Sequence, residues 1–224
     1  MIIFMLEKMG DFFDNRLSEY DKHQMTCIDS AEQFYLFTAR CLPTGAKSRI
    51  LDLGCGTGLE LERYFMLNPS AEVVGIDIAP KMLKTLKNKF GDKGLTLILG
   101  SYFDVDFEKD AFDAVVSVES LHHFTKVEKI LLYQKIRNAL KSNGYFLLTD
   151  YFSLSDSDEE FQRNELLRLK KLQGLGDNEL YHYDTPLTVQ HEIEALRAAG
   201  FSKITILNHW GATHTLKSRK ISIC

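Results

Sequence analysis

The chain has 224 residues, of which 45% are hydrophobic and 26% are charged, and its formal net charge is −4. A chain of this length and composition can bury a core without disulfides or metals, and we expect one domain spanning residues 1–224. The mild negative charge argues against broad electrostatic binding to nucleic acid or to an anionic membrane.

The cysteine spacing and the first residues of the chain indicate in which cellular compartment the protein is expected. The opening "MIIFML" is short and lacks a basic stretch, so it predicts neither a signal peptide nor a membrane span. The cysteines have no C-x-x-C or zinc-finger spacing, which predicts reduced thiols in a cytoplasmic protein. They are Cys27, Cys41, Cys55 and Cys224.

Residues 11–42 have a helical pattern rich in aromatic side chains, and we expect them to form a helical cap within residues 1–45. From residue 47 onward, short apolar runs alternate with helical patterns, which predicts an α/β fold, a Rossmann-like three-layer sandwich on a mostly parallel sheet. The expected strands are Arg49–Leu53, Glu72–Asp77, Leu95–Gly100, Ala114–Val118 and Tyr145–Thr149. The expected helices among them are Leu59–Leu67, one beginning at Pro80, and one that Thr125 and Glu128 open as a capping box.

The third of these helices is expected to end at Asn143-Gly144. Its inward face is expected to hold Val127, Ile130, Leu131, Ile136 and Leu140.

The last part of the chain predicts a helical insert and a terminal hairpin. Within residues 153–185, we expect an amphipathic helix that, with the N-terminal cap, forms a lid over the carboxyl ends of the strands. A final helix is expected at 188–199, followed by an antiparallel hairpin of residues 203–208 and 212 to the C-terminus. The apolar residues of the insert helix are Phe161, Leu166, Leu169 and Leu172.

The stretch "ILDLGCGTGLE", residues 50–60, runs from a strand into a glycine turn. Such a turn lets backbone approach a ligand at the start of a helix. Leu59 stands where the dinucleotide fingerprint has its third glycine, and the lysine of a phosphate-binding loop is absent. Asp52 would repel a pyrophosphate but would attract a cationic ligand. These departures favour S-adenosylmethionine, whose product after methyl transfer is S-adenosylhomocysteine.

A second acid supports a nucleoside site. Asp77 ends the second strand, where α/β nucleoside sites place the acid that accepts hydrogen bonds from ribose hydroxyls, although alone it could simply cap a turn. After the third strand, Ser101, Tyr102 and Phe103 offer a polar group and aromatic surface for adenine.

Four stretches resemble the successive motifs of class I S-adenosylmethionine-dependent methyltransferases. They are "ILDLGCGTG", "VVGIDIAPKML", "FDAVVSVESLHHF" and "LKSNGYFLLTDYF", in the family's order and spacing. The resemblance implies a seven-stranded sheet with an antiparallel last strand. It implies that Asp77 holds the ribose, that Ile78 and Met82 flank the adenine, and that Ser117 and Glu119 line the methionine side. It also implies that Tyr20 closes over the cofactor and that the methionine moiety is surrounded by Asp52, Gly54, Cys55, Gly56 and Gly58.

Methyl transfer needs alignment of the acceptor more than any fixed catalytic group. His122 and His123, after the fourth strand, are candidates for a general base, and the alternative is that they bond backbone or pack beneath the cofactor. Asp150 lacks the partner acids of a catechol-type metal site, so no metal is expected. The stretch "ELYHYDTP", residues 179–186, could bind the acceptor or form an exposed loop.

The leading interpretation is a methyltransferase acting on a small-molecule acceptor, as a monomer or a homodimer. The layout also resembles that of carboxy-S-adenosylmethionine synthases, which modify the cofactor with prephenate for tRNA wobble modification. That reaction needs cations to hold a dicarboxylate, and the insert supplies Arg163, Arg168, Lys170 and Lys171. A non-catalytic S-adenosylmethionine-binding module is a third possibility. Leu59 and Asp52 disfavour a nicotinamide-dependent dehydrogenase.

Overall fold

The computed structural model describes residues 5–176 and 179–220. The strands are β1 Arg49–Leu53, β2 Glu72–Asp77, β3 Gly94–Leu99, β4 Phe112–Val118, β5 Leu140–Tyr151, β6 Phe201–Trp210 and β7 Thr213–Lys220. The helices are α1 Met9–Cys27, α2 Ala31–Cys41, α3 Leu59–Leu67, α4 Pro80–Phe90, α5 Lys126–Ala139, α6 Asp156–Gln173 and α7 Val189–Ala198.

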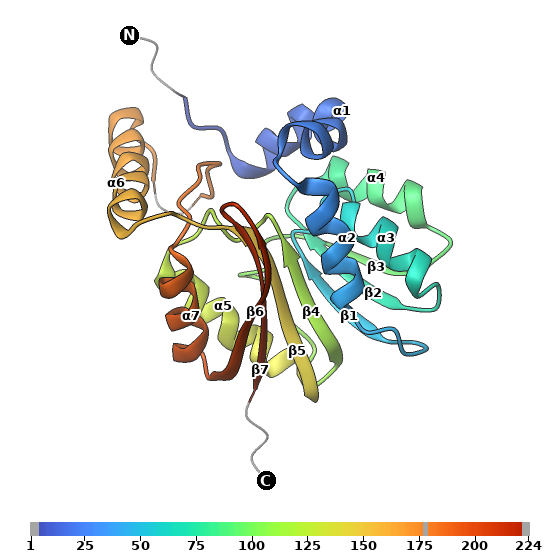
Figure 1. Ribbon diagram of the computed structural model, residues 1–224. Coiled ribbons are helices and arrows are strands. Elements are labelled where there is room, and N and C mark those ends of the chain that lie inside the picture. The colour runs from blue at the N-terminus through green and yellow to red at the C-terminus, as the bar shows by residue number, and fades with distance from the viewer. Residues whose placement is uncertain (1–4, 177–178, 221–224) are drawn as a thin grey trace.

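The strands form one seven-stranded sheet in the order β3-β2-β1-β4-β5-β7-β6 (Figure 1). Strands β1 to β5 pair in parallel, and β7 runs antiparallel to both β5 and β6. The predicted fold class is therefore confirmed, including the reversed last strand.

Helices cover both faces of the sheet, which makes three layers (Figure 1). On one face, Phe34 of α2, Leu61 of α3 and Leu86 of α4 belong to one buried cluster. On the other face, Leu132 of α5 and Leu196 of α7 belong to a second. Because each helix buries an apolar stripe against the sheet, the carboxyl ends of the strands are held rigidly at one edge.

One predicted helix end is wrong. Asn143-Gly144 was expected to end α5, but α5 ends at Ala139 and β5 begins at Leu140. Phe112 pairs with Leu140 while Ala114 pairs with Tyr145, so the register of β5 shifts around the glycine. A Cβ on Gly144 would lie 2.9 Å from the Phe112 carbonyl oxygen, so the glycine permits a close approach of backbones rather than a helix stop.

The predicted inward face of α5 is also wrong in part. Val127 and Leu131 are 70% and 59% exposed. The buried face instead includes Lys129 and Tyr133, which both bond to the Glu192 carboxylate of α7. The Lys129 ammonium lies 2.5 Å from a Glu192 oxygen. A lysine with such a partner can be buried. The buried face of α5 is therefore rotated about the helix axis relative to the predicted one.

Helix α6 differs from its predicted role as a packed amphipathic helix. Leu169 is buried, but Phe161 and Leu172 are exposed. Figure 1 shows α6 standing beyond the end of the sheet, beside the N-terminal segment, rather than on a sheet face. The backbone N–H of Leu6 donates to Gln173 Oε1 at 3.0 Å and ties these two parts together.

The predicted helical region 11–42 is two helices that break at Ser30, whose φ is +59°. The N-terminal segment also meets residues 179–186. Met9 N–H donates to the Leu180 carbonyl, and His182 N–H donates to the Glu7 carbonyl. The two predicted parts of the lid thus lie together, and Met9 and Leu180 line the same cavity.

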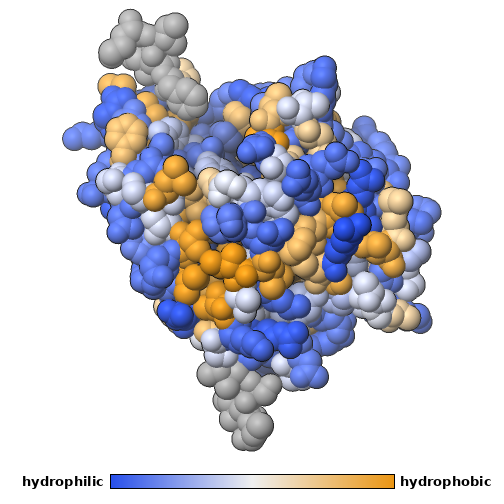
Figure 2. Space-filling model, viewed as in Figure 1, coloured by the Kyte–Doolittle hydropathy of each residue, from blue (hydrophilic) through white to orange (hydrophobic). Residues whose placement is uncertain are grey.

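The face of the molecule drawn in Figure 2 is mostly polar. Figure 2 shows polar side chains over most of one face, with an apolar patch in the region of β6, where Ile206 is exposed. No helix in the described residues is long and apolar enough to cross a membrane. The predictions for residues 1–4, Cys224 and the rest of the last four residues lie outside the described residues.

Candidate active site

The glycine turn adopts backbone conformations that favour glycine. Gly54, Gly56 and Gly58 have φ values of +73°, +48° and +78°. A Cβ on Gly54 would lie 2.1 Å from Ser120 Oγ, and one on Gly58 would lie 2.3 Å from Leu86 Cδ1. The turn is therefore packed tightly between the β4–α5 loop and α4, with Gly54 and Gly56 on a cavity wall.

That cavity, which we call the first cavity, has a volume of about 550 Å³ and lies at the carboxyl ends of β1 to β4. Many residues predicted to contact the cofactor or catalyse the reaction line it: Tyr20, Gly54, Gly56, Asp77, Ile78, Met82, Ser101, Tyr102, Glu119 and His123. Sequence reasoning missed the other lining residues: Met9, Phe13, Gly100, Ser120, Phe124 and Leu180. Several of these belong to the lid, whose position no local pattern reveals.

Other predicted cofactor residues lie behind the wall of the first cavity. Ser117 is buried in β4 and donates to the Leu53 carbonyl at 3.0 Å. Phe103 packs on Phe124, with ring centroids 4.7 Å apart. The residues that do not reach the wall of the first cavity are Asp52, Cys55, Gly58, Phe103 and Ser117.

Asp77 both caps a turn and lines the first cavity. One carboxylate oxygen accepts the Gly56 N–H at 2.8 Å, and the other accepts the Ala79 N–H at 2.8 Å. Burial raises the pKa of Asp77, and these backbone donors partly offset the increase. Each carboxylate oxygen has two lone pairs, so Asp77 can still accept hydrogen bonds from a ligand.

Three acids beneath and beside the cavity each have a buried oxygen without a hydrogen-bond partner. Asp52 and Glu60 are 1% and 5% exposed, and each has one carboxylate oxygen without a hydrogen-bond partner. Burial raises the pKa of both groups, and for Asp52 the charge of Glu60 raises it further. Glu119 also has an unpartnered oxygen, and burial together with Asp150 raises its pKa to about 8. A cationic ligand suits this site, and a pyrophosphate does not.

A second cavity of about 1070 Å³ adjoins the first. The two cavities share four wall residues: Phe13, Tyr20, Glu119 and His123. The second cavity is otherwise lined by Phe12, Arg16, Glu19, His23, Gln24, Ile28, His122, Tyr151, His182 and Asp184. The two cavities are therefore neighbours along this wall.

His122 lies between two aspartates in the wall of the second cavity. Its Nδ1 is 2.6 Å from Asp150 Oδ1, and the other Asp150 oxygen accepts the Leu121 N–H at 2.9 Å. Its Nε2 is 3.7 Å from Asp184 Oδ1. Burial lowers the pKa of His122, but Asp150 and then Asp184 outweigh burial and raise it to about 9.

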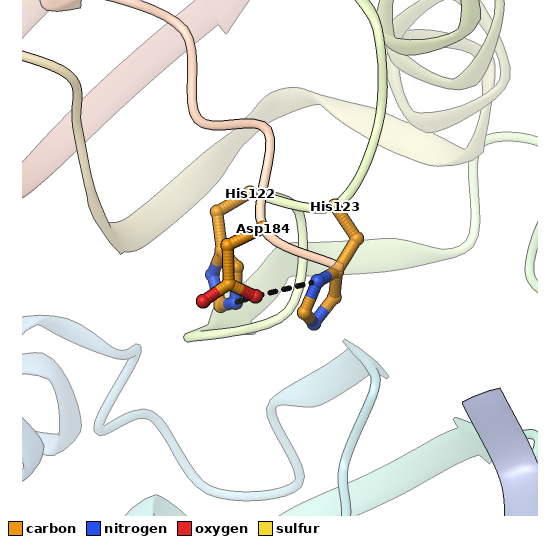
Figure 3. A group of neighbouring side chains, drawn as sticks. All are labelled: His122, His123 and Asp184. Atoms are coloured by element: carbon orange, nitrogen blue, oxygen red, sulfur yellow. Dashed lines mark ion pairs between the residues drawn. The ribbon is translucent and has the colours of Figure 1, made fainter. Parts of the chain in front are cut away.

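His123 and His182 approach the same Asp184 oxygen. His123 Nδ1 lies 3.1 Å from it and 3.2 Å from the Tyr183 carbonyl oxygen, and Figure 3 shows that its other ring nitrogen points away from Asp184. His182 Nε2 lies 4.0 Å from that oxygen. Burial lowers the pKa of His123, and it lowers that of His182 to about 4. The sequence predicted for Asp184 only that it belongs to residues 179–186, which could bind the acceptor.

The parallel sheet with a reversed last strand, and a glycine turn between buried acids, define the class I S-adenosylmethionine-dependent methyltransferase fold. Residues 51–148 match the family model described as "Methyltransferase domain". Residues 51–148 are therefore a methyltransferase domain of the kind whose cofactor is S-adenosylmethionine.

Individual proteins resemble the chain over most of its length. A carboxy-S-adenosyl-L-methionine synthase from Nautilia profundicola is 24% identical over 216 residues, covering 91% of this chain and 88% of that protein. A solved protein from Nostoc punctiforme superposes with a TM-score of 0.71 at 21% identity, covering 97% of this chain and 63% of that one. DhpI, solved in complex with SAH, superposes with a TM-score of 0.69 at 18% identity, covering 94% of each chain. These structural likenesses establish the fold.

Proposed function

We propose that this protein transfers the methyl group of S-adenosylmethionine to a small molecule bound in the second cavity. The observation that carries the proposal is the wall shared by the two cavities at Phe13, Tyr20, Glu119 and His123. Methyl transfer is an in-line displacement, so the acceptor atom must stand opposite the sulfur at the methyl carbon. Adjoining cavities supply that alignment, and the lid excludes water.

The chain's own residues fit the cofactor in the first cavity. Asp77 would accept the ribose hydroxyls, Ile78 and Met82 would flank the adenine, and Ser101 and Tyr102 would meet its edge. The unpartnered oxygen of Glu119, which lines the cavity, would attract the ammonium and sulfonium groups of the cofactor. Asp52 and Glu60, which do not line the cavity, would add to this attraction from behind its wall. The bound cofactor supplies an activated methyl group, so the protein needs only to orient the acceptor and remove its proton.

His122 and His123 remain our proposed catalytic residues. Both line the second cavity, and His123 also lines the first. A hydroxyl or amine in the second cavity would therefore lose its proton to His123, whose pKa is lowered. His122, whose pKa is raised to about 9, would act as a base only at higher pH.

A cavity-filling substitution tests the proposal. Ile28 lines the second cavity and not the first. In Ile28→Trp we expect methyl transfer to a screened acceptor to fall at least tenfold, with an unchanged Kd for S-adenosylmethionine by calorimetry. The control is Leu154→Trp at an exposed position, which should change neither quantity. Equal turnover in Ile28→Trp, or no turnover with any acceptor in a broad small-molecule screen, would refute the proposal, and the latter outcome would favour a non-catalytic binding module.

A second candidate is a cofactor-modifying reaction like that of a carboxy-S-adenosylmethionine synthase, linked to tRNA wobble modification. The full-length similarity to such a synthase favours it. The charges do not. Among the described residues that line the second cavity, the one lysine or arginine is Arg16. Its guanidinium lies 2.7 Å from the Glu7 carboxylate. Arg168 pairs with Glu165 at 2.7 Å, and Arg163 lines a different cavity.

Mass spectrometry of the ligand retained on purification separates the two candidates. We expect S-adenosylmethionine or S-adenosylhomocysteine. A retained cofactor that carries an extra carboxyl group would favour the second candidate instead.

A further inference from the structure

Metal-ligating side chains from two distant segments converge in the wall of the second cavity. His122 and His123 follow β4, whereas Asp184 follows α6, and their ligand atoms lie within 4.8 Å of one another (Figure 3). We propose that His122, His123 and Asp184 bind one divalent transition-metal ion, zinc, and that this ion holds an acceptor hydroxyl. The inference rests on the proposed function, because the ion would occupy its acceptor cavity.

The spacing of the donor atoms suits zinc. Bonds of about 2.0–2.1 Å in a tetrahedral site place neighbouring ligand atoms about 3.3 Å apart. The observed separations from Asp184 Oδ1 are 3.1 Å to His123 Nδ1 and 3.7 Å to His122 Nε2. Imidazole and carboxylate ligands together are typical of zinc sites. His123 Nδ1 would have to release its proton and its bond to the Tyr183 carbonyl, 3.2 Å away. With that change, small side-chain movements would complete a site that the backbone already brings together.

An outer partner orients one of the ligands. Asp150 Oδ1 lies 2.6 Å from His122 Nδ1 and holds a proton there, so Nε2, which faces Asp184, is the nitrogen that would release its proton and bind the ion. The Leu121 N–H holds the second Asp150 oxygen at 2.9 Å. A carboxylate that accepts the far N–H of a ligating histidine is the usual outer shell of a zinc site. Asp150 therefore acts as the partner of His122 and not as a ligand.

Backbone contacts fix the third ligand. The Thr185 N–H donates to the His122 carbonyl at 2.8 Å, which places Asp184 beside the histidine pair. The Tyr151 hydroxyl bonds to the Asp184 carboxylate as well. Because the segment is anchored next to its target, little ordering is needed when the ion binds.

Three protein ligands leave a coordination position for the acceptor, as in catalytic zinc sites. A hydroxyl bound there would lose its proton more readily. Because the two histidines would then be ligands and no longer proton acceptors, Glu119, with an unpartnered oxygen on the shared wall, would accept that proton. The acceptor oxygen then forms a bond to the methyl carbon while the carbon–sulfur bond breaks, and its electron pair stays on sulfur. The predicted substrate class is therefore an alcohol or a phenol. The sequence predicted no metal because Asp150 lacks the partner acids of a catechol-type site. The ligands proposed here are of a different kind, two histidines and Asp184.

Metal content tests the site directly. Full-length protein without a histidine tag is stripped with a chelator, dialysed against zinc chloride and analysed by plasma mass spectrometry. We expect one zinc ion per chain, and the cobalt-substituted protein should show the visible absorption of four-coordinate Co²⁺. His123→Asn and Asp184→Asn should each lose the ion. His209→Asn is the control, because His209 is exposed on β6 and is not one of the proposed ligands.

Absence of bound zinc, or equal zinc in His123→Asn, Asp184→Asn and the parent protein, would overturn the metal site. Calorimetry with S-adenosylmethionine distinguishes this result from failure of the proposed function. Binding should be equal with and without zinc, because Asp77 is held by the Gly56 and Ala79 N–H groups and not by the proposed ligands. Full turnover without metal would refute the zinc site and leave the proposed function standing. Loss of cofactor binding in both forms would count against the proposed function.

Discussion

The substitution Asp52→Asn should weaken cofactor binding and yet stabilise the ligand-free protein. Asp52 is 1% exposed, and one of its oxygens has no hydrogen-bond partner. Its pKa is raised well above the ordinary value, first by burial and then by Glu60. The folded protein therefore holds a proton that the unfolded chain releases above about pH 4. Such a group costs stability as the pH rises from the unfolded pKa to the folded pKa.

The expected magnitudes follow from this linkage. While Asp52 is ionised in the unfolded chain and protonated in the folded chain, each pH unit costs about 1.4 kcal/mol. The Asp52→Asn substitution removes this cost, so the ligand-free Tm at pH 8 should rise by about 2–4 °C per kcal/mol recovered. The gain should vanish near pH 4. A bound cation can ionise Asp52 but cannot ionise an amide. The substitution should therefore weaken S-adenosylmethionine binding by about 1.5–3 kcal/mol, which is about 10- to 150-fold in Kd.

Differential scanning calorimetry of the ligand-free protein at pH 4 and pH 8, with titration calorimetry for the cofactor, measures both effects. Glu62→Gln is the matched control, because Glu62 is an exposed carboxylate on the same helix as Glu60. An ordinary folding defect would lower both the Tm and the affinity. A lower Tm at pH 8, or an unchanged Kd in Asp52→Asn, would refute the reasoning.

Three further substitutions have definite expected outcomes. Asp77→Ala should raise the Kd for S-adenosylmethionine more than tenfold by titration calorimetry, and an equal Kd would exclude Asp77 from the cofactor site. Gly54→Ala should lower the Tm well beyond the effect of Gly174→Ala. Both glycines have a positive φ, but only at Gly54 would a Cβ clash with a neighbour. Equal decreases in Tm would show that backbone strain alone matters. Glu192→Gln should destabilise the protein by about 3–5 kcal/mol in urea unfolding, because it leaves Lys129 buried without a counter-charge. A change under about 1 kcal/mol there would contradict the buried pair.

The elements next to the glycine turn could be predicted from sequence because their signals are local. β1, α3 and β2 begin and end where the apolar runs, glycines and Asn68-Pro69 predict. The buried face of α5 could not be predicted, because Lys129 is a surface residue by type and is buried only through Glu192, which is far away in the chain.

The site divides in the same way. The first cavity is built largely from strand ends, and the sequence predicted that Asp77, Ile78 and Ser101 meet there. The second cavity depends on residues 179–186, whose position is set by contacts with the N-terminal segment. Nothing in the local pattern around His182 or Asp184 indicates those contacts. The convergence of three histidines on one carboxylate therefore emerged only from the structure.

The most direct test of the central claim is a crystal structure of the protein with S-adenosylhomocysteine bound. The account predicts the adenosine against Ile78 and Met82, the ribose on Asp77, and the sulfur at the wall that the two cavities share, facing the second cavity. A cofactor whose sulfur is turned away from that wall, or whose adenosine lies in the second cavity, would contradict it.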